Sequence, residues 1–133
     1  HDGFLGHSYI GEWVNLGANT NTSDLKNNYS NIRMQLNDSK EIETEKMFIG
    51  SIIGDFTSIA ISTKLNSGTY IGTGANIFTA GFQDKHISSF SWGAKDKVGL
   101  NRFLKKCQIV MDRRGEVLSE SLKNRLINLW KMS

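Results

Sequence analysis

The chain has 133 residues, enough for one compact domain with a modest core. Its 16 basic and 13 acidic residues give a formal net charge of +3, which suits anionic ligands, but no basic block or aromatic-basic stripe predicts nucleic-acid binding. No secretory signal is evident, and no apolar run approaches the roughly 20 residues of a membrane span. The single cysteine, Cys107, cannot form an internal disulfide, so we expect a reducing, cytoplasmic location. Because the chain begins without methionine, we expect a further domain upstream of His1.

The first apolar residues recur every six positions, at Phe4, Ile10 and Leu16. A helix repeats its buried face every 3.6 residues and a strand every two, so neither explains this spacing. A period of six is typical of a parallel β-helix, in which each hexapeptide forms one side of a coil and three make one turn. The same spacing returns downstream at Ile53, Ile59, Leu65, Ile71 and Ile77.

Small residues accompany this apolar repeat at two further positions. Four residues after the large residues of the downstream repeat come Thr57, Thr63, Thr69, Ala75 and Gly81, which we expect to fill the tight space beside them. The residue directly after a large one is often glycine or alanine, at Gly11, Gly17, Gly54, Ala60 and Gly72. We expect these to form corners whose backbone dihedrals favour small residues.

The repeat is interrupted between Leu16 and Ile53, which are 37 residues apart, one more than six hexapeptides. Within this interval Ile32, Met34 and Leu36 alternate with polar residues. We therefore predict an inserted β-hairpin or loop that leaves the coil near 24 and rejoins it near 46 or 47. Loops that project from a regular scaffold often carry ligand contacts.

The repeat also dissolves after Ile77. We expect the aromatic residues of the following stretch to cover the open end of the solenoid: Phe78, Phe82, Phe90 and Trp92.

A helical period then replaces the period of six. One helix carries Leu100, Phe103, Leu104, Cys107 and Met111 on a single face and ends at the sequence RRG, and a second begins after Ser119. We interpret both helices as packing elements. The fold class we predict is an all-β solenoid, a parallel β-helix over 1–93 with an insertion at about 24–46, followed by a C-terminal α-helical extension over 94–133.

The segments HDGFLG, IGEWVNLGANTNT and IGDFTSIAISTKLNSGTYIGTGANI resemble the left-handed β-helix, hexapeptide-repeat acetyltransferase domain of the bifunctional N-acetylglucosamine-1-phosphate uridyltransferase and glucosamine-1-phosphate acetyltransferase family. The closest likeness is to its sugar nucleotidyltransferase-like branch, in the stretches TSDLKNNY, FTAGFQ and FSWG. The resemblance covers His1 to about Gly93. It implies a left-handed β-helix, a homotrimer with active sites between the solenoids, acetyl-CoA as donor and an amino sugar phosphate as acceptor. It also implies a nucleotidyltransferase as the upstream domain.

The family motif implies roles for particular residues when it is laid on this chain hexapeptide by hexapeptide. His1 falls on the catalytic histidine, Asn15 on a sugar-binding asparagine, and Gly17 and Ala18 on the segment that lines the thioester site. The substrate-binding lysine most nearly matches Lys46. The chain departs from the motif in two places, with Phe4 in place of a tyrosine and Asp24-Leu25 in place of Asn-Tyr.

Acetyl transfer to an amine needs a base, and a histidine near neutral pKa suits that task. His1 is our first candidate and His7 the alternative. Backbone N–H groups at a glycine-rich corner can stabilise the oxyanion of the tetrahedral intermediate.

Three further basic residues are candidates for phosphate contacts. Lys26 and Lys46 bracket the insertion and could hold a sugar phosphate, although a solvated surface explains them equally well. Arg113, with Arg114, could meet the phosphates of coenzyme A, or could simply be a helix C-terminal charge cluster.

Two other functions remain open at this point. The β-helix could be a non-catalytic module that trimerises a nucleotidyltransferase. The three histidines also allow a zinc enzyme of the γ-carbonic anhydrase type, which uses the same solenoid. His1 and His7 are one coil side apart, however, and His86 lies beyond the last clear repeat, so we expect no metal site.

Overall fold

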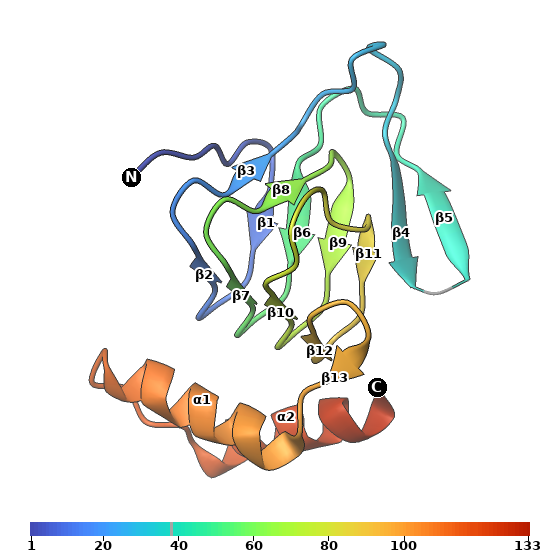
Figure 1. Ribbon diagram of the computed structural model, residues 1–133. Helices are drawn as coiled ribbons and strands as arrows, with labels where there is room; N and C mark the ends of the chain where they lie inside the picture. Colours follow the sequence, from blue (N-terminus) through green and yellow to red (C-terminus); the bar gives the residue numbers. More distant parts are fainter. Residues whose placement is uncertain (38) are drawn as a thin grey trace.

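The computed structural model describes residues 1–37 and 39–133. Most of the strands are short and parallel and lie in three sheets, and two helices follow them (Figure 1). The first sheet contains, in order, β1 (Tyr9–Ile10), β6 (Ser51–Ile53), β9 (Thr69–Ile71) and β11 (His86–Ile87). The second contains β2 (Asn15–Leu16), β7 (Ser58–Ile59), β10 (Asn76–Ile77) and β12 (Ser91–Trp92), with β13 (Asp96–Lys97) antiparallel to β12. The third pairs β3 (Asn21–Thr22) with β8 (Lys64–Leu65).

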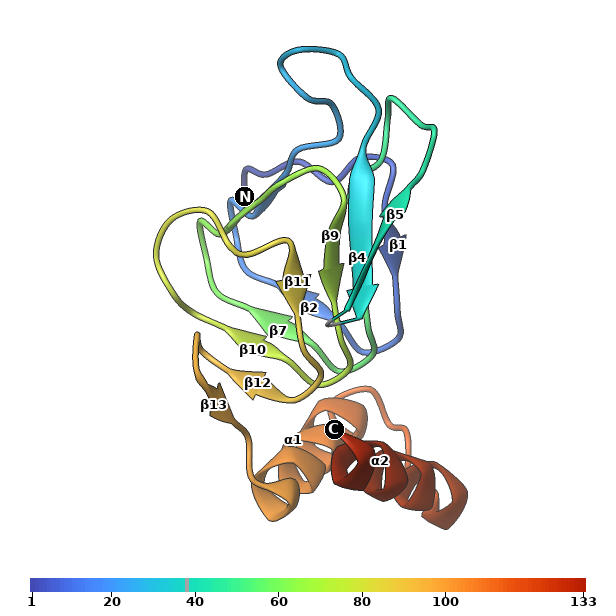
Figure 2. The same cartoon turned by 90° about the vertical axis from the view of Figure 1, so that its right-hand side faces the viewer.

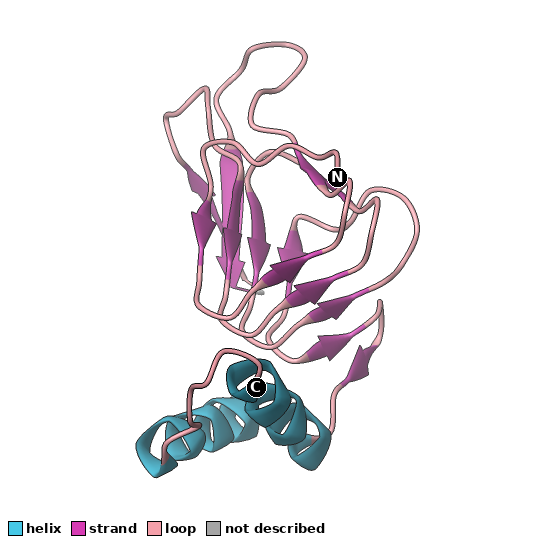
Figure 3. Cartoon of the chain, turned by 90° about the vertical axis from the view of Figure 1, so that its left-hand side faces the viewer, coloured by secondary structure: helices cyan, strands magenta, loops and turns pink. Residues whose placement is uncertain are grey.

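The chain visits the three sheets in turn and then returns to the first, as Figures 2 and 3 show from opposite sides. Ile53 is paired with Ile71 and Ile59 with Ile77, so the chain comes back to the same sheet after 18 residues, or three hexapeptides. All five residues of the predicted apolar repeat, Ile53, Ile59, Leu65, Ile71 and Ile77, are between 0% and 3% exposed. The predicted period therefore identifies the buried core of the second and third coils. In the first coil Ile10 and Leu16 are half-buried, and Phe4 is 52% exposed, contrary to the prediction.

The corner prediction was wrong about which residue bears the unusual dihedral. Positive φ occurs three residues after the large apolar residue, as at Phe56 (57°), Ser62 (59°) and Gly74 (69°). Gly54, directly after Ile53, is small for another reason: a Cβ there would lie 2.6 Å from the backbone nitrogen of Thr73 in the next coil. Close stacking of successive coils, rather than left-handed backbone, requires the glycines at this position.

The inserted segment is a hairpin of β4 (Arg33–Asn37) and β5 (Lys40–Glu43), paired antiparallel. It leaves the coil after Asp24, whose carbonyl accepts a hydrogen bond from the Ile49 N–H at 3.0 Å where the chain rejoins. Strand β4 lies beside β9 and β11 (Figure 1). Ile32 and Met34 are buried, whereas Leu36, the third apolar residue of the alternation, is 39% exposed. The backbone of Gly68 approaches Ile32 so closely that a Cβ would clash.

The aromatic residues after Ile77 do not cover the open end as predicted. The coil continues through β11 and β12, where Ile87 and Trp92 stack on the preceding coil. Phe78 and Phe82 are 52% and 64% exposed, and Phe90 is buried at a corner that packs against the helices. The short spacing between strands in this last coil, 16 residues instead of 18, hid the repeat from sequence inspection.

Helices α1 (Leu100–Asp112) and α2 (Glu120–Met132) lie side by side below the coils, which confirms the predicted C-terminal helical extension (Figures 1 and 2). The predicted class all-β is wrong for the chain as a whole, because it includes these helices. They pack at the corner that joins the first sheet to the second, where Phe56 and Phe90 project outward from two coils. The buried face of α1 consists of Phe103, Cys107 and Met111. Helix α2 is capped by Ser119, whose hydroxyl accepts from the Leu122 N–H at 3.1 Å. Neither helix in the described ranges has the length and apolar character to cross a bilayer.

Candidate functional site

The structure brings three of the predicted site residues together in one place. His1, Gly17 and Ala18 line a pocket of about 300 Å³, which we call the histidine pocket. Its other lining residues are Asp2, Gly3, Phe4, Leu5, Leu16 and Thr20. The Asn19 N–H donates to the Asp2 carbonyl at 2.6 Å, which ties the segment bearing His1 to the corner bearing Ala18.

The backbone amides of this corner are not equally available. The Gly17 N–H already donates to the Ile59 carbonyl of the next coil at 2.8 Å. Among the described residues, no acceptor is paired with the Ala18 N–H. Of the two backbone donors expected here, Ala18 is therefore the one that is free to meet a ligand oxygen.

His7 lies in different surroundings. Its Nδ1 is 2.7 Å from Oδ2 of Asp24, and its ring lies 5.4 Å from that of Phe48. The side chain is 59% exposed. A carboxylate on Nδ1 orients an imidazole and leaves its other nitrogen available, so His7 keeps the geometry of a base, but away from Gly17 and Ala18.

Asn15 and Arg113 meet in a second place, between the outer face of the second sheet and α1. We call this pocket of about 560 Å³ the basic groove. Its floor is a row of outward-facing residues paired in register from coil to coil: Asn15, Ser58, Asn76 and Trp92. Its wall is one face of α1 with Arg102, Lys106, Val110 and Arg113, and its lining is completed by Trp13, Val14, Val98 and Arg114.

Lys106 joins the wall of the basic groove to its floor. Its Nζ donates to the Phe56 carbonyl at 2.9 Å and to Oδ1 of Asn76 at 3.0 Å. Neither partner is charged, and burial lowers the pKa of the Lys106 ammonium. An anion beside Lys106 would oppose that effect of burial.

Sequence reasoning missed Lys106, Arg102 and Trp92 as site residues. The guanidinium of Arg102 lies 4.1 Å from the centre of the Trp92 ring, a cation–π contact that fixes one end of the groove. A signal was present: Arg102, Lys106 and Arg113 recur at helical spacing directly beside the apolar stripe of α1. What could not be foreseen is that this second face turns toward a sheet rather than toward solvent.

The two remaining predicted residues, Lys26 and Lys46, lie outside both sites. Lys26 lines a separate pocket of about 440 Å³ with Asn66 and Phe82, and its Nζ donates to the Asn31 carbonyl at 3.1 Å. Lys46 contributes backbone bonds at the base of the hairpin, where its carbonyl accepts from the Ile32 N–H at 2.8 Å. Within one copy of the chain, neither lysine reaches His1 or Asn15.

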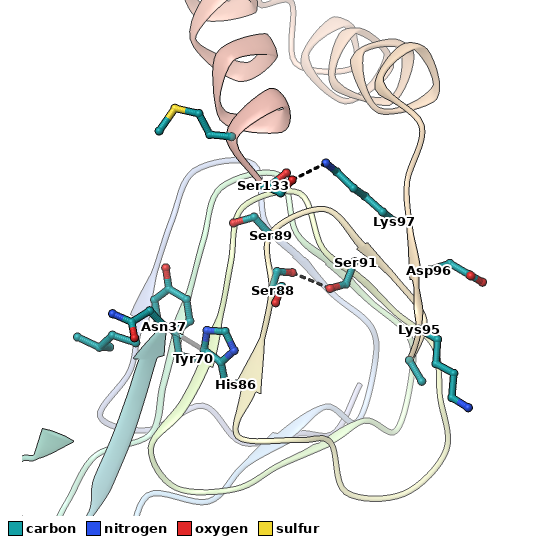
Figure 4. Close-up of a pocket in the computed structure, with 13 residues that line it drawn as sticks. Asn37, Tyr70, His86, Ser88, Ser89, Ser91, Lys95, Asp96, Lys97 and Ser133 are labelled. Atoms are coloured by element: carbon teal, nitrogen blue, oxygen red, sulfur yellow. Dashed lines mark hydrogen bonds between the residues drawn. The ribbon is translucent and has the colours of Figure 1, made fainter. Parts of the chain in front are cut away.

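A further pocket of about 540 Å³ lies beside the C-terminal end of α2 (Figure 4). The His86 ring stacks on that of Tyr70, with 5.5 Å between centres and 6° between planes. Lys97 closes one side by donating to the Ser133 carbonyl at 2.9 Å. None of the residues proposed from the sequence as catalytic or binding lines this pocket. Across residues 1–37 and 39–133, no group of three or more His, Cys, Asp or Glu side chains is placed to hold a metal ion.

No protein-family model matches the chain, and no curated protein matches it. The candidate sites are therefore judged by their own residues. The histidine pocket and the basic groove lie on neighbouring residues of one strand, since Leu16 lines the first and Asn15 the second. Strand β2 thus separates a pocket lined by a histidine from a groove lined by basic residues.

Proposed function

We propose that the chain transfers an acetyl group from acetyl-CoA to the amine of an amino sugar phosphate, of the glucosamine 1-phosphate class, on a left-handed parallel β-helix. The observation that carries the proposal is that His1 lines one pocket with Gly17 and Ala18. A base and a backbone N–H donor in one cavity are what transfer of an acyl group to an amine needs. The 18-residue return of the chain to each sheet supports the β-helix.

In the proposed reaction the substrate amine attacks the thioester carbonyl carbon. A carbon–nitrogen bond forms, and the His1 imidazole takes the proton that the amine loses. The carbonyl oxygen becomes an oxyanion that accepts a hydrogen bond from the Ala18 N–H. The carbon–sulfur bond then breaks, the electron pair leaves with sulfur, and His1 returns its proton to the thiolate. The products are an N-acetylated sugar phosphate and free coenzyme A.

Release of free thiol tests this proposal, measured with acetyl-CoA and glucosamine 1-phosphate. We expect turnover by the unaltered chain and a loss of about 10²- to 10⁴-fold in His1→Ala, because removal of a general base has effects of that size. His7→Ala should stay within a few-fold of the original rate. The reverse order would make His7 the base, and no thiol release by the unaltered chain would refute acetyl transfer.

We also propose a homotrimer, in which a second copy places Lys46 or Lys26 near the sugar phosphate. Large apolar side chains on the surface support an assembled state: Ile61 is 71% exposed, Phe82 64% and Phe78 52%. The same observation favours a second candidate function, a non-catalytic module that trimerises a nucleotidyltransferase. A trimer by light scattering without thiol release would select the module.

A further inference from the structure

The basic groove is built from two rows that run along the stack of coils. Each residue of the floor row comes from a different coil, so the row crosses all four parallel strands of the second sheet. Helix α1 begins beside the last coil, where Arg102 lies on Trp92, and Lys106 then reaches Asn76 and the Phe56 carbonyl. Val110 and Arg113 continue in that direction toward Asn15 on the first coil. The groove is therefore elongated, with α1 below the second sheet as in Figure 1.

The charge of this groove is not balanced by carboxylates. Its lining includes Arg102, Lys106, Arg113 and Arg114 but neither aspartate nor glutamate. In the part of the chain that the structure describes, ion pairs join only His7 to Asp24 and Arg33 to Glu41 and Glu43. Four cations along one elongated cavity create a positive potential that attracts an anion carrying several charges.

The polar and aromatic residues of the lining indicate which kind of anion the groove can bind. Asn15 and Ser58 offer hydrogen bonds along the floor between the two ends. At the Arg102 end the Trp92 ring is already engaged, by the guanidinium and by a T-shaped contact with Phe78, with 5.2 Å between ring centres. At the opposite end Trp13 is half-buried, and one side of its ring stacks on Phe56 at 6.3 Å and 15°. The rest of that indole is a surface on which a planar ring can stack.

We propose that the basic groove binds a phosphorylated nucleoside, with its phosphates held by Lys106 and Arg113 and its base against Trp13. The volume of about 560 Å³ suits a ligand of that size and is small for a polymer. Arginine binds phosphate oxygens through two parallel hydrogen bonds, and a half-buried ammonium adds a strong point charge. The inference stands independently of acetyl transfer. Coenzyme A carries this chemistry in its adenosine 3′,5′-bisphosphate end, and a nucleoside diphosphate sugar carries it too.

Titration calorimetry on the full chain at low salt tests the proposal with three probes: adenosine 3′,5′-bisphosphate, uridine diphosphate and inorganic pyrophosphate. We expect at least one nucleoside probe to bind about tenfold more tightly than pyrophosphate, because base stacking on an aromatic ring adds affinity. A preference for the adenosine probe identifies a coenzyme A type of ligand, and a preference for uridine diphosphate identifies a sugar nucleotide. Either preference supports the inference.

Arg113→Gln should weaken that binding about tenfold, since it removes a charge-assisted contact at an exposed position that folding does not need. Lys105→Gln is the matched control, because Lys105 is exposed on the same helix and does not line the groove. Its effect should stay below about twofold. Equal losses in the two variants, absence of binding by all three probes, or tighter binding of a single-stranded oligonucleotide would overturn the proposal.

The outcome is separable from that of the proposed function. His1→Ala should abolish thiol release and leave nucleoside binding unchanged, because His1 lines the histidine pocket and not the groove. Charge-dependent binding without any thiol release would uphold the groove and refute acetyl transfer. Thiol release by the unaltered chain, an unchanged KM for acetyl-CoA in Arg113→Gln and no binding of the probes would together support acetyl transfer and refute nucleoside binding in the groove.

Discussion

Lys106 of α1 donates a hydrogen bond to the side-chain oxygen of Asn76 on β10, at 3.0 Å. This bond joins the helical extension to the outer face of the coils, and it sets a half-buried ammonium where no carboxylate among the described residues pairs with it. The position of Lys106 therefore matters for stability as well as for binding.

The first prediction concerns the pH dependence of stability. Burial lowers the pKa of Lys106 in the folded chain below its value of 10.5 in an unfolded chain. At neutral pH the group is charged in both states, and the cost of burying the charge is fully present. As the pH rises through the folded pKa toward 10.5, the unfolded state binds more protons, so the free energy of unfolding increases. Between about pH 7 and about pH 10.5, urea unfolding should show that the free energy of unfolding of the unaltered chain rises relative to that of Lys106→Met.

Replacement of the exposed Lys105 by methionine controls for the loss of a lysine from α1. Lys85 has a pKa that burial lowers as well, but it is present in every variant and cancels from the comparison. A constant difference between the unaltered chain and Lys106→Met across this range would contradict the prediction.

The second prediction concerns the contact between α1 and the coil at Gly74. Gly74 has φ of +69°, and a Cβ there would lie 2.8 Å from the rings of both Phe103 and Phe90. Gly74→Ala should lower the free energy of unfolding by about 3 kcal/mol, through left-handed backbone strain and overpacking together. Gly81→Ala is the matched control, because Gly81 has φ of +83° with nothing within 4 Å. It should lose only about 1 kcal/mol, and equal losses by urea denaturation would exclude the packing contribution.

The third prediction compares two buried hydroxyls inside the coils. The Thr69 hydroxyl donates to the Asn66 carbonyl at 2.7 Å, and the same bond to a carbonyl three residues earlier recurs at Thr20, Thr63 and Ser91. Ser51 is fully buried, and its Oγ has no partner in the described part of the chain. Thr69→Val should cost about 1 kcal/mol. Ser51→Ala should leave stability unchanged or raise it by about 1 kcal/mol, because it removes an unsatisfied polar group.

The fourth prediction concerns the reactivity of Cys107. Its side chain is fully buried against Phe56 and Phe103, and burial raises the pKa of the thiol to about 12. Three pKa units above the ordinary value of 9.0 reduce the thiolate fraction about a thousandfold. Ellman's reagent at about pH 8 should therefore react at least that much more slowly with the folded chain than with the chain in urea. Rapid labelling of the folded chain would show that α1 separates readily from the corner.

The apolar period was sufficient to locate the core inside the coils, because a column of stacked side chains leaves a direct trace in spacing. It was not sufficient to assign the corners. Some left-handed positions hold glycine, as at Gly74, but others hold Trp13, Phe56 and Phe90. These aromatic residues pack with α1, a contact that no local pattern encodes. A clash between coils, as at Gly54, likewise depends on a residue 19 positions away, Thr73.

In the candidate sites, too, some residues could be predicted from local sequence and others depend on tertiary contacts. The histidine pocket is lined by His1, Gly17 and Ala18, which lie within 18 residues of one another. A single motif of that length can therefore predict that they share a site. Lys106 joins the basic groove only because α1 returns across the sheet to Asn76, 30 residues earlier in the chain. Tertiary packing decides which face of a helix meets a sheet. From the sequence alone, the charges on this face of α1 therefore look like those of an ordinary solvated surface.

Strand β13 has a consequence for how copies of the chain meet one another. It runs antiparallel to β12, pairing Asp96 with Trp92 and Lys97 with Ser91, and both of its side chains are exposed. An incoming parallel strand from another molecule would find the hydrogen-bonding pattern reversed and two charged groups at the rim. The second sheet therefore ends in a strand that does not favour end-to-end addition of a parallel strand from another copy.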